Sequence, residues 1–93
     1  FCGFAATVPM SDPDAALREC DRAIGQLGAL GVQISTDVNG VPLDDPRFAP
    51  FWARMDALCR PVWIHPYRTA ARADYPTEPL SKYGLWQVFG WPY

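Results

Sequence analysis

Three apolar segments alternate with two amphipathic segments along the first 65 residues of the chain. Residues 1–8 are mostly apolar, residues 32–36 alternate apolar and polar side chains, and residues 62–65 are β-branched or aromatic up to a histidine. These three patterns predict β-strands. Between them, residues 13–27 and 48–59 carry apolar side chains at three- and four-residue intervals, which predicts two helices.

Short signals mark where these elements begin and end. Asp12 stands where a helix N-cap is expected, and Asp44 and Asp45 precede the second helix as capping residues without the spacing of an acid–base pair. Gly28 and Gly31 predict a left-handed stop between the first helix and the second strand. Each helix therefore has its own signals in the sequence.

The remaining segments are loops with one further candidate helix. The pair Asn39-Gly40 predicts a turn after the second strand. Residues 67–81 show mixed charge and no periodicity, which predicts a long loop. Residues 82–89 have the composition of one more short helix.

The spacing of the strands indicates a repeated β/α unit. The strands end near Val8, Thr36 and His65, at intervals of 28 and 29 residues that each hold one helix. Such repeats form parallel strands joined by right-handed crossovers. A barrel of eight units takes about 250 residues, or roughly 31 per unit. The fold class is therefore α/β, either a partial (β/α)8 TIM barrel of about three units or a small doubly wound sheet with the same period.

The third strand places a histidine at its carboxyl end. Side chains two residues apart share a face, so Trp63 and His65 point one way, and Val62 and Ile64 point towards the helix layer. Pro66 removes a ladder donor, so the strand is expected to stop at His65. In the second strand the same alternation places Gln33 and Ser35 on the face that also carries His65, and Asp37 shares their parity.

Composition narrows the class of protein. The 93 residues make one small domain at most, and 49% hydrophobic and 14% aromatic residues argue against disorder. A net charge of -2 without a basic cluster argues against nucleic acid or anionic membranes as partners. No apolar run reaches the roughly 20 residues of a membrane helix and no signal peptide is evident, so a cytoplasmic location is expected. The odd set Cys2, Cys20 and Cys59 lacks metal or redox spacing and is expected to be buried and reduced.

Six motifs carry a family resemblance along nearly all of the chain. They are Ala5-Ala6-Thr7-Val8-Pro9, Asp12-Pro13, Leu27-Gly28-Ala29-Leu30-Gly31-Val32-Gln33-Ile34, Leu43-Asp44-Asp45-Pro46-Arg47-Phe48, Pro61-Val62-Trp63-Ile64-His65-Pro66 and Gly90-Trp91-Pro92-Tyr93. In this order and spacing the chain resembles the amidohydrolase-related family (amidohydrolase 2) that includes aminocarboxymuconate-semialdehyde decarboxylase and resorcylate decarboxylase.

The resemblance implies a metal-dependent (β/α)8 barrel of which residues 1–93 are a fragment containing strands three to five. His65 matches the family's strand-five metal ligand, and the other ligands fall outside the chain. The implied cofactor is a divalent metal, with zinc as first choice and manganese as the alternative. The implied activity is hydrolysis or non-oxidative decarboxylation of a small carboxylated compound by a full-length protein that can be a homo-oligomer. One imidazole cannot hold such a metal alone, so the isolated chain is expected to be inactive.

Further residues are candidates for the same site. Arg68 can bind a substrate carboxylate through two parallel hydrogen bonds, or serve as a solvated loop charge. Ser35 and Asp37 share the strand parity that can place them at the mouth of the barrel, where the strands end. Trp63 is instead expected to fill the barrel interior. The long loop and the helix after it add four candidates that can flank the pocket, namely Glu78, Tyr83, Trp86 and Trp91. The alternative from another class is a non-enzymatic α/β binding module in which His65 is structural.

Overall fold

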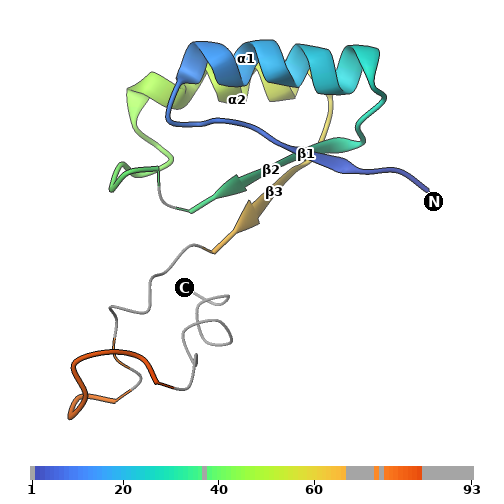
Figure 1. Ribbon diagram of the computed structural model, residues 1–93. Coiled ribbons are helices and arrows are strands. Elements are labelled where there is room, and N and C mark those ends of the chain that lie inside the picture. Colours follow the sequence, from blue (N-terminus) through green and yellow to red (C-terminus); the bar gives the residue numbers. More distant parts are fainter. Residues whose placement is uncertain (1, 37, 67–72, 74, 83–93) are drawn as a thin grey trace.

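The protein forms a three-stranded sheet with its helices on one face (Figure 1). The computed structural model describes residues 2–36, 38–66, 73 and 75–82. Along the chain the elements are β1 (Ala5–Thr7), α1 (Pro13–Cys20), the π-helical turn η1 (Asp21–Gln26), β2 (Gly31–Ser35), the 3-10 turn η2 (Pro46–Phe48), α2 (Ala49–Leu58) and β3 (Val62–His65).

The sheet is parallel, as the repeated unit predicts. Its strand order is β1-β2-β3, and both pairings are parallel. Thr7 lies opposite Gln33, and Ser35 lies opposite His65. Because the strands share one direction, their carboxyl ends meet at one edge of the sheet, which we call the carboxyl edge.

The first helix begins where the sequence predicts. The Asp12 carboxylate accepts a hydrogen bond from the backbone N–H of Ala15 at 3.0 Å, which satisfies one of the unpaired donors at the start of α1. After Cys20 the helix widens into η1, in which the N–H of Leu27 donates to the carbonyl of Arg22 at 3.2 Å. Gly28 then ends the helical segment with φ of 75°.

The second helix is preceded by a capped 3-10 turn. The Asp45 carboxylate accepts hydrogen bonds from the backbone N–H of Arg47 at 3.0 Å and from its Nε at 2.9 Å. These two bonds hold the pKa of Asp45 below its usual value. Asp45 therefore has the capping role expected for it, and the turn that it begins leads directly into α2.

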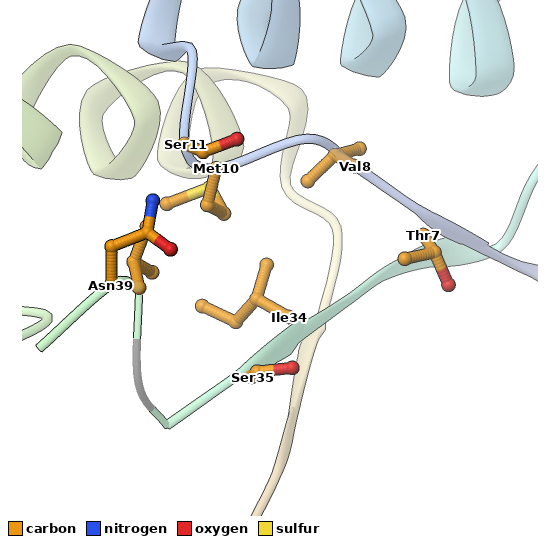
Figure 2. A pocket seen from close by; sticks show the side chains of 8 residues that line it. Thr7, Val8, Met10, Ser11, Ile34, Ser35 and Asn39 are labelled. Carbon is orange, nitrogen blue, oxygen red and sulfur yellow. The ribbon is translucent and has the colours of Figure 1, made fainter. Parts of the chain in front are cut away.

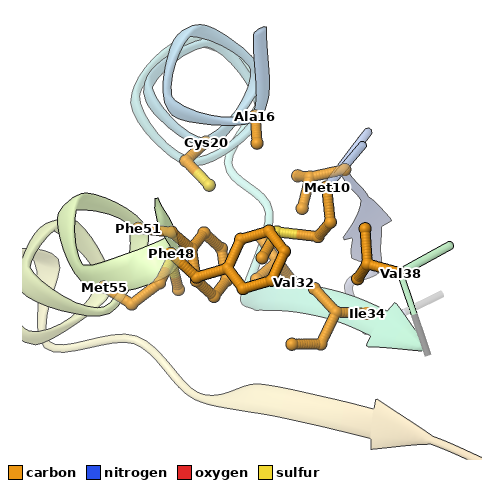
Figure 3. Close-up of a cluster of buried hydrophobic side chains, with 10 residues drawn as sticks. Met10, Ala16, Cys20, Val32, Ile34, Val38, Phe48, Phe51 and Met55 are labelled. Carbon is orange, nitrogen blue, oxygen red and sulfur yellow. The ribbon is translucent and has the colours of Figure 1, made fainter. Parts of the chain in front are cut away.

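The hydrophobic core lies between the helices and one face of the sheet (Figure 3). Both helices contribute apolar side chains that meet Val32 and Ile34 of β2, which are 0% and 2% exposed. The helix side of this core consists of Ala16 and Cys20 from α1, Phe48 from η2, and Phe51 and Met55 from α2. Val32 and Ile34 thus meet the helix layer, as their parity predicts.

Three expectations from the sequence are wrong in detail. The first strand is limited to Ala5–Thr7 instead of residues 1–8, because the chain turns after it through a hydrogen bond from Met10 N–H to the Val8 carbonyl at 3.0 Å. Of the cysteines only Cys20 is buried, and this burial raises the pKa of its thiol. Ile64 is 48% exposed, because within the described part of the chain neither helix reaches the end of β3.

The segment after β3 is described only in part. Residues 75–82 form turns, with the N–H of Glu78 donating to the carbonyl of Tyr75 at 3.0 Å. The helix expected over 82–89 lies outside the described residues except for Lys82. Among the helices that the structure describes, none has the length and apolarity to cross a membrane.

The sequence suggests that Gly31 belongs to a left-handed stop, but the structure gives a different reason for a glycine at this position. It lies inside β2, where a Cβ atom would meet the Pro61 carbonyl oxygen and would lie 2.7 Å from Cζ3 of Trp63. The close approach of β3 therefore excludes a side chain at this position.

We expect Gly31→Ala to destabilise the intact protein by about 1–3 kcal/mol, because the added methyl group must displace backbone atoms. Gly25→Ala is the matched control, since a Cβ at Gly25 meets nothing within 4 Å. Its expected effect is a gain of up to about 1 kcal/mol. Denaturant unfolding of both variants measures the difference, and equal effects would show that β3 does not restrict Gly31.

Candidate active site

The candidate site is built on the carboxyl edge of the sheet. β1 ends at Thr7, β2 at Ser35 and β3 at His65. In-register residues of parallel strands share a face, so the pairings place Thr7 with Gln33, and Ser35 with His65, on the side away from the helices. We call this side, formed by Thr7, Gln33, Ser35, Trp63 and His65, the interior face.

His65 is exposed at the last position of β3, as the sequence predicts. Its backbone carbonyl accepts a hydrogen bond from the N–H of Thr36 at 3.0 Å, which ties the end of β3 to the end of β2. Its Nδ1 lies 2.9 Å from the carbonyl oxygen of Pro66. In the tautomer that donates this hydrogen bond, the ring proton is on Nδ1 and the lone pair is on Nε2, which is the arrangement of a metal-binding imidazole.

Trp63 lies one layer below His65 on the interior face. Its Cζ3 atom approaches Gly31, which is two residues before Gln33, the register partner of Trp63. The indole is therefore directed towards the amino ends of the strands, away from the layer of Ser35 and His65. Trp63 is 46% exposed among the described residues, so its expected role in filling the barrel interior stays a prediction, and the upper layer is polar.

A cavity of about 200 Å³ lies beside the carboxyl ends of β1 and β2 (Figure 2). Figure 2 shows Ile34 directed towards Met10, whereas the hydroxyl of Thr7 lies on the other side of its strand. The cavity is lined by Thr7, Val8, Met10, Ser11, Ile34, Ser35, Val38 and Asn39. The cavity adjoins the core side of the sheet, where Ile34 faces the helices, and Ser35 is the lining residue whose register partner is His65.

The cavity depends on the turn that follows β2. Asn39 and Gly40 have φ of 55° and 77°, and an isolated antiparallel bridge joins Val38 to Val41. This confirms the turn predicted from the Asn-Gly pair and places Val38 in the core at 8% exposure. Asn39 thereby comes to the rim of the cavity (Figure 2).

The described residues do not form a complete metal site. Among them there is no group of three or more histidine, cysteine, aspartate or glutamate side chains that could hold an ion. A catalytic metal site needs at least three protein ligands around an open position. At the carboxyl edge of the described sheet, His65 is the candidate donor, and a metal bound there would need further ligands from outside the described residues.

Several predicted residues fall outside this geometry. Arg68 and Asp37 lie outside the described residues, as do the aromatic candidates Tyr83, Trp86 and Trp91. Glu78 forms an ion pair with Lys82 at 3.2 Å.

Sequence reasoning missed Thr7 and the cavity residues of the two loops. The inward face of β1 follows from its register with β2, which a three-residue strand does not reveal by alternation.

The sequence is similar to those of known amidohydrolase-family proteins. Residues 1–82 match the sequence model of a family described as "Amidohydrolase". The chain is 40% identical over 75 residues to a gamma-resorcylate decarboxylase of Rhodococcus jostii (strain RHA1), covering 71% of this chain and 22% of that protein. It is 34% identical over 70 residues to a 2-amino-3-carboxymuconate-6-semialdehyde decarboxylase of Dictyostelium discoideum, covering 75% and 20%. The chain thus spans about a fifth of the length of these relatives.

Solved structures show the same similarity. The fold matches the crystal structure of a 2,6-dihydroxybenzoate decarboxylase from Rhizobium with a TM-score of 0.59 and 28% identity, over 94% of this chain and 26% of that one. The same values hold for a 2,6-dihydroxybenzoate decarboxylase complexed with 2,6-dihydroxybenzoate. Together with the parallel sheet, this similarity confirms the α/β fold expected from the sequence, a part of a (β/α)8 barrel, and excludes the doubly wound alternative.

Proposed function

The chain belongs to the amidohydrolase family, and on this premise we propose that the intact protein is a metal-dependent decarboxylase of a small carboxylated aromatic compound. The sequence alone leaves hydrolysis and decarboxylation open. The named relatives are decarboxylases, which favours the loss of carbon dioxide over the attack of water. The observation that carries the proposal is the position of His65, exposed at the carboxyl edge with its Nδ1 beside the Pro66 carbonyl.

In this proposal His65 holds a divalent metal through Nε2. The Pro66 carbonyl fixes the orientation of the ring, and the hydrogen bond from Thr36 N–H fixes the backbone beneath it. A divalent metal supplies Lewis-acid polarisation of a bound substrate oxygen. Zinc is our first assignment and manganese the alternative, because an imidazole ligand suits zinc well. We assign the remaining ligands to segments beyond these 93 residues, because the chain spans only about a fifth of the length of its relatives.

Two further parts of the proposal concern the substrate and the place of this chain in the barrel. We assign residues 1–93 to strands three to five, so that an isolated fragment has one metal ligand and no activity. We assign to Arg68, three residues after β3, the recognition of the substrate carboxylate, because a guanidinium matches a carboxylate with two parallel hydrogen bonds. The substrate class follows the relatives, one of which is complexed with 2,6-dihydroxybenzoate.

We expect the intact protein to release carbon dioxide from 2,6-dihydroxybenzoate or a related carboxylated aromatic compound. Dialysis against a chelator should abolish this activity, and added zinc or manganese should restore it, since the metal is reversibly bound. Carbon dioxide release and bound metal are measured on the same samples. Full activity in a sample without metal, or hydrolysis of amides or esters without decarboxylation, would contradict the proposal.

A further inference from the structure

The interior face carries three polar side chains that lack a hydrogen-bond partner among the described residues. They are Thr7, Gln33 and Ser35, and all three lie on strands that a closed barrel surrounds. A polar group that is enclosed without a hydrogen bond is costly, so such groups pair with other side chains, with water or with a ligand. Ser35 differs from the other two because it lies in the layer of His65.

The register places the Ser35 side chain beside the imidazole. Ser35 and His65 are direct partners in the β2–β3 pairing. The 3.0 Å hydrogen bond from Thr36 N–H to the His65 carbonyl holds the strands in this register. Neighbouring strands lie about 4.8 Å apart, and in-register side chains point to the same face. A small molecule bound to a metal at this imidazole would therefore lie over Ser35 where it extends towards β2.

The surrounding residues leave this layer open to a ligand. Trp63 is directed towards Gly31 and away from His65, and Gln33 lies one layer lower. The Ser35 residue is itself partly exposed at the end of β2. Among the polar side chains of β2, that of Ser35 is thus the one in register with the proposed metal ligand.

We propose that Ser35 is a specificity-determining residue that hydrogen-bonds a ring hydroxyl adjacent to the carboxylate of the substrate. This inference rests on the proposed function. A serine hydroxyl both donates and accepts a hydrogen bond, which suits a phenolic hydroxyl, and it offers nothing to an unsubstituted ring position. In a hydroxylated benzoate the carboxylate and the adjacent hydroxyl lie on neighbouring ring carbons, so a compound bound at His65 through one group presents the other to the neighbouring strand.

The test compares the affinity of two compounds for variants of the intact, metal-loaded protein. For Ser35→Ala we expect a loss of about tenfold in affinity for 2,6-dihydroxybenzoate and less than about twofold for benzoate, with unchanged metal content. Ser35→Thr keeps the hydroxyl and should bind 2,6-dihydroxybenzoate within about threefold of the parent. Thr77→Ala, which removes an exposed hydroxyl from the loop after β3, should leave both affinities unchanged. Calorimetry gives the affinities without relying on turnover.

Each outcome is distinct. The proposal is supported when Ser35→Ala weakens only the hydroxylated compound and Ser35→Thr restores it. It is overturned when Ser35→Ala binds 2,6-dihydroxybenzoate as the parent does, when both compounds weaken equally, or when the metal is lost. If the parent protein binds and decarboxylates neither compound, the proposed function fails and the assignment of Ser35 fails with it. If the parent decarboxylates 2,6-dihydroxybenzoate but Ser35→Ala binds it as tightly as the parent does, the assignment of Ser35 fails and the proposed function stands.

Discussion

Replacing His65 with alanine in the intact protein is expected to remove most of the bound divalent metal and to lower decarboxylation by more than about a hundredfold. Groups that merely orient a metal ligand typically contribute about 10–100-fold to affinity or activity, so the loss of a ligand itself should cost more. The Nδ1 of His65 is 2.9 Å from the Pro66 carbonyl oxygen, so the tautomer that donates this bond leaves the lone pair of Nε2 for the proposed metal. The alanine side chain offers no donor in its place.

The measurement is the metal content per protein chain, accompanied by the rate of carbon dioxide release. Ile64→Val is the matched control, because Ile64 is adjacent in sequence but points to the opposite face of β3. This control should retain both metal and activity. If His65→Ala binds as much metal as the parent protein, His65 is not a ligand, and the alternative in which it is structural gains support.

Truncation of Phe51 to alanine is expected to destabilise the intact protein by about 3–5 kcal/mol. Phe51 is 1% exposed between α2 and β2, and its ring meets that of Trp52 edge to face at 5.0 Å and 71°. Trp52 cannot move into the space left by the ring without a cost, because its Nε1 donates to the Leu43 carbonyl at 2.9 Å. The cavity should therefore persist in the variant.

Phe51→Leu provides the graded comparison, since it keeps most of the volume and should cost less than about 1.5 kcal/mol. Chemical denaturation monitored by circular dichroism measures both values. A loss from Phe51→Ala no greater than that from Phe51→Leu would mean that the core collapses around the missing ring, and that the packing of α2 on the sheet is less restrictive than the structure indicates.

The elements that the sequence predicts well are those defined by local signals. The start of α1 follows from Asp12, the end of the helical segment from Gly28, and the position of His65 from the proline after it. The interval between strands correctly indicates parallel β/α units. Each of these features depends on residues a few positions apart, which a single sequence displays directly.

The features that sequence reasoning misses depend on contacts between distant segments. Gly31 is required because β3 packs against it from about 30 residues further along the chain. Cys20 is buried because it lies on the side of α1 that meets the core, whereas Cys59 is exposed because it follows the end of α2 with φ of 48°.

The order of strands in this sheet also bears on how the protein is made. Strands that are neighbours in the sheet are also consecutive along the chain, so each can dock onto its predecessor as synthesis proceeds. At every stage of such growth the newest strand exposes one unpaired row of backbone donors and acceptors. In such growth β3 exposes this row along Val62–His65 until it is paired, and during that interval a wrong strand can pair with it in place of its proper neighbour.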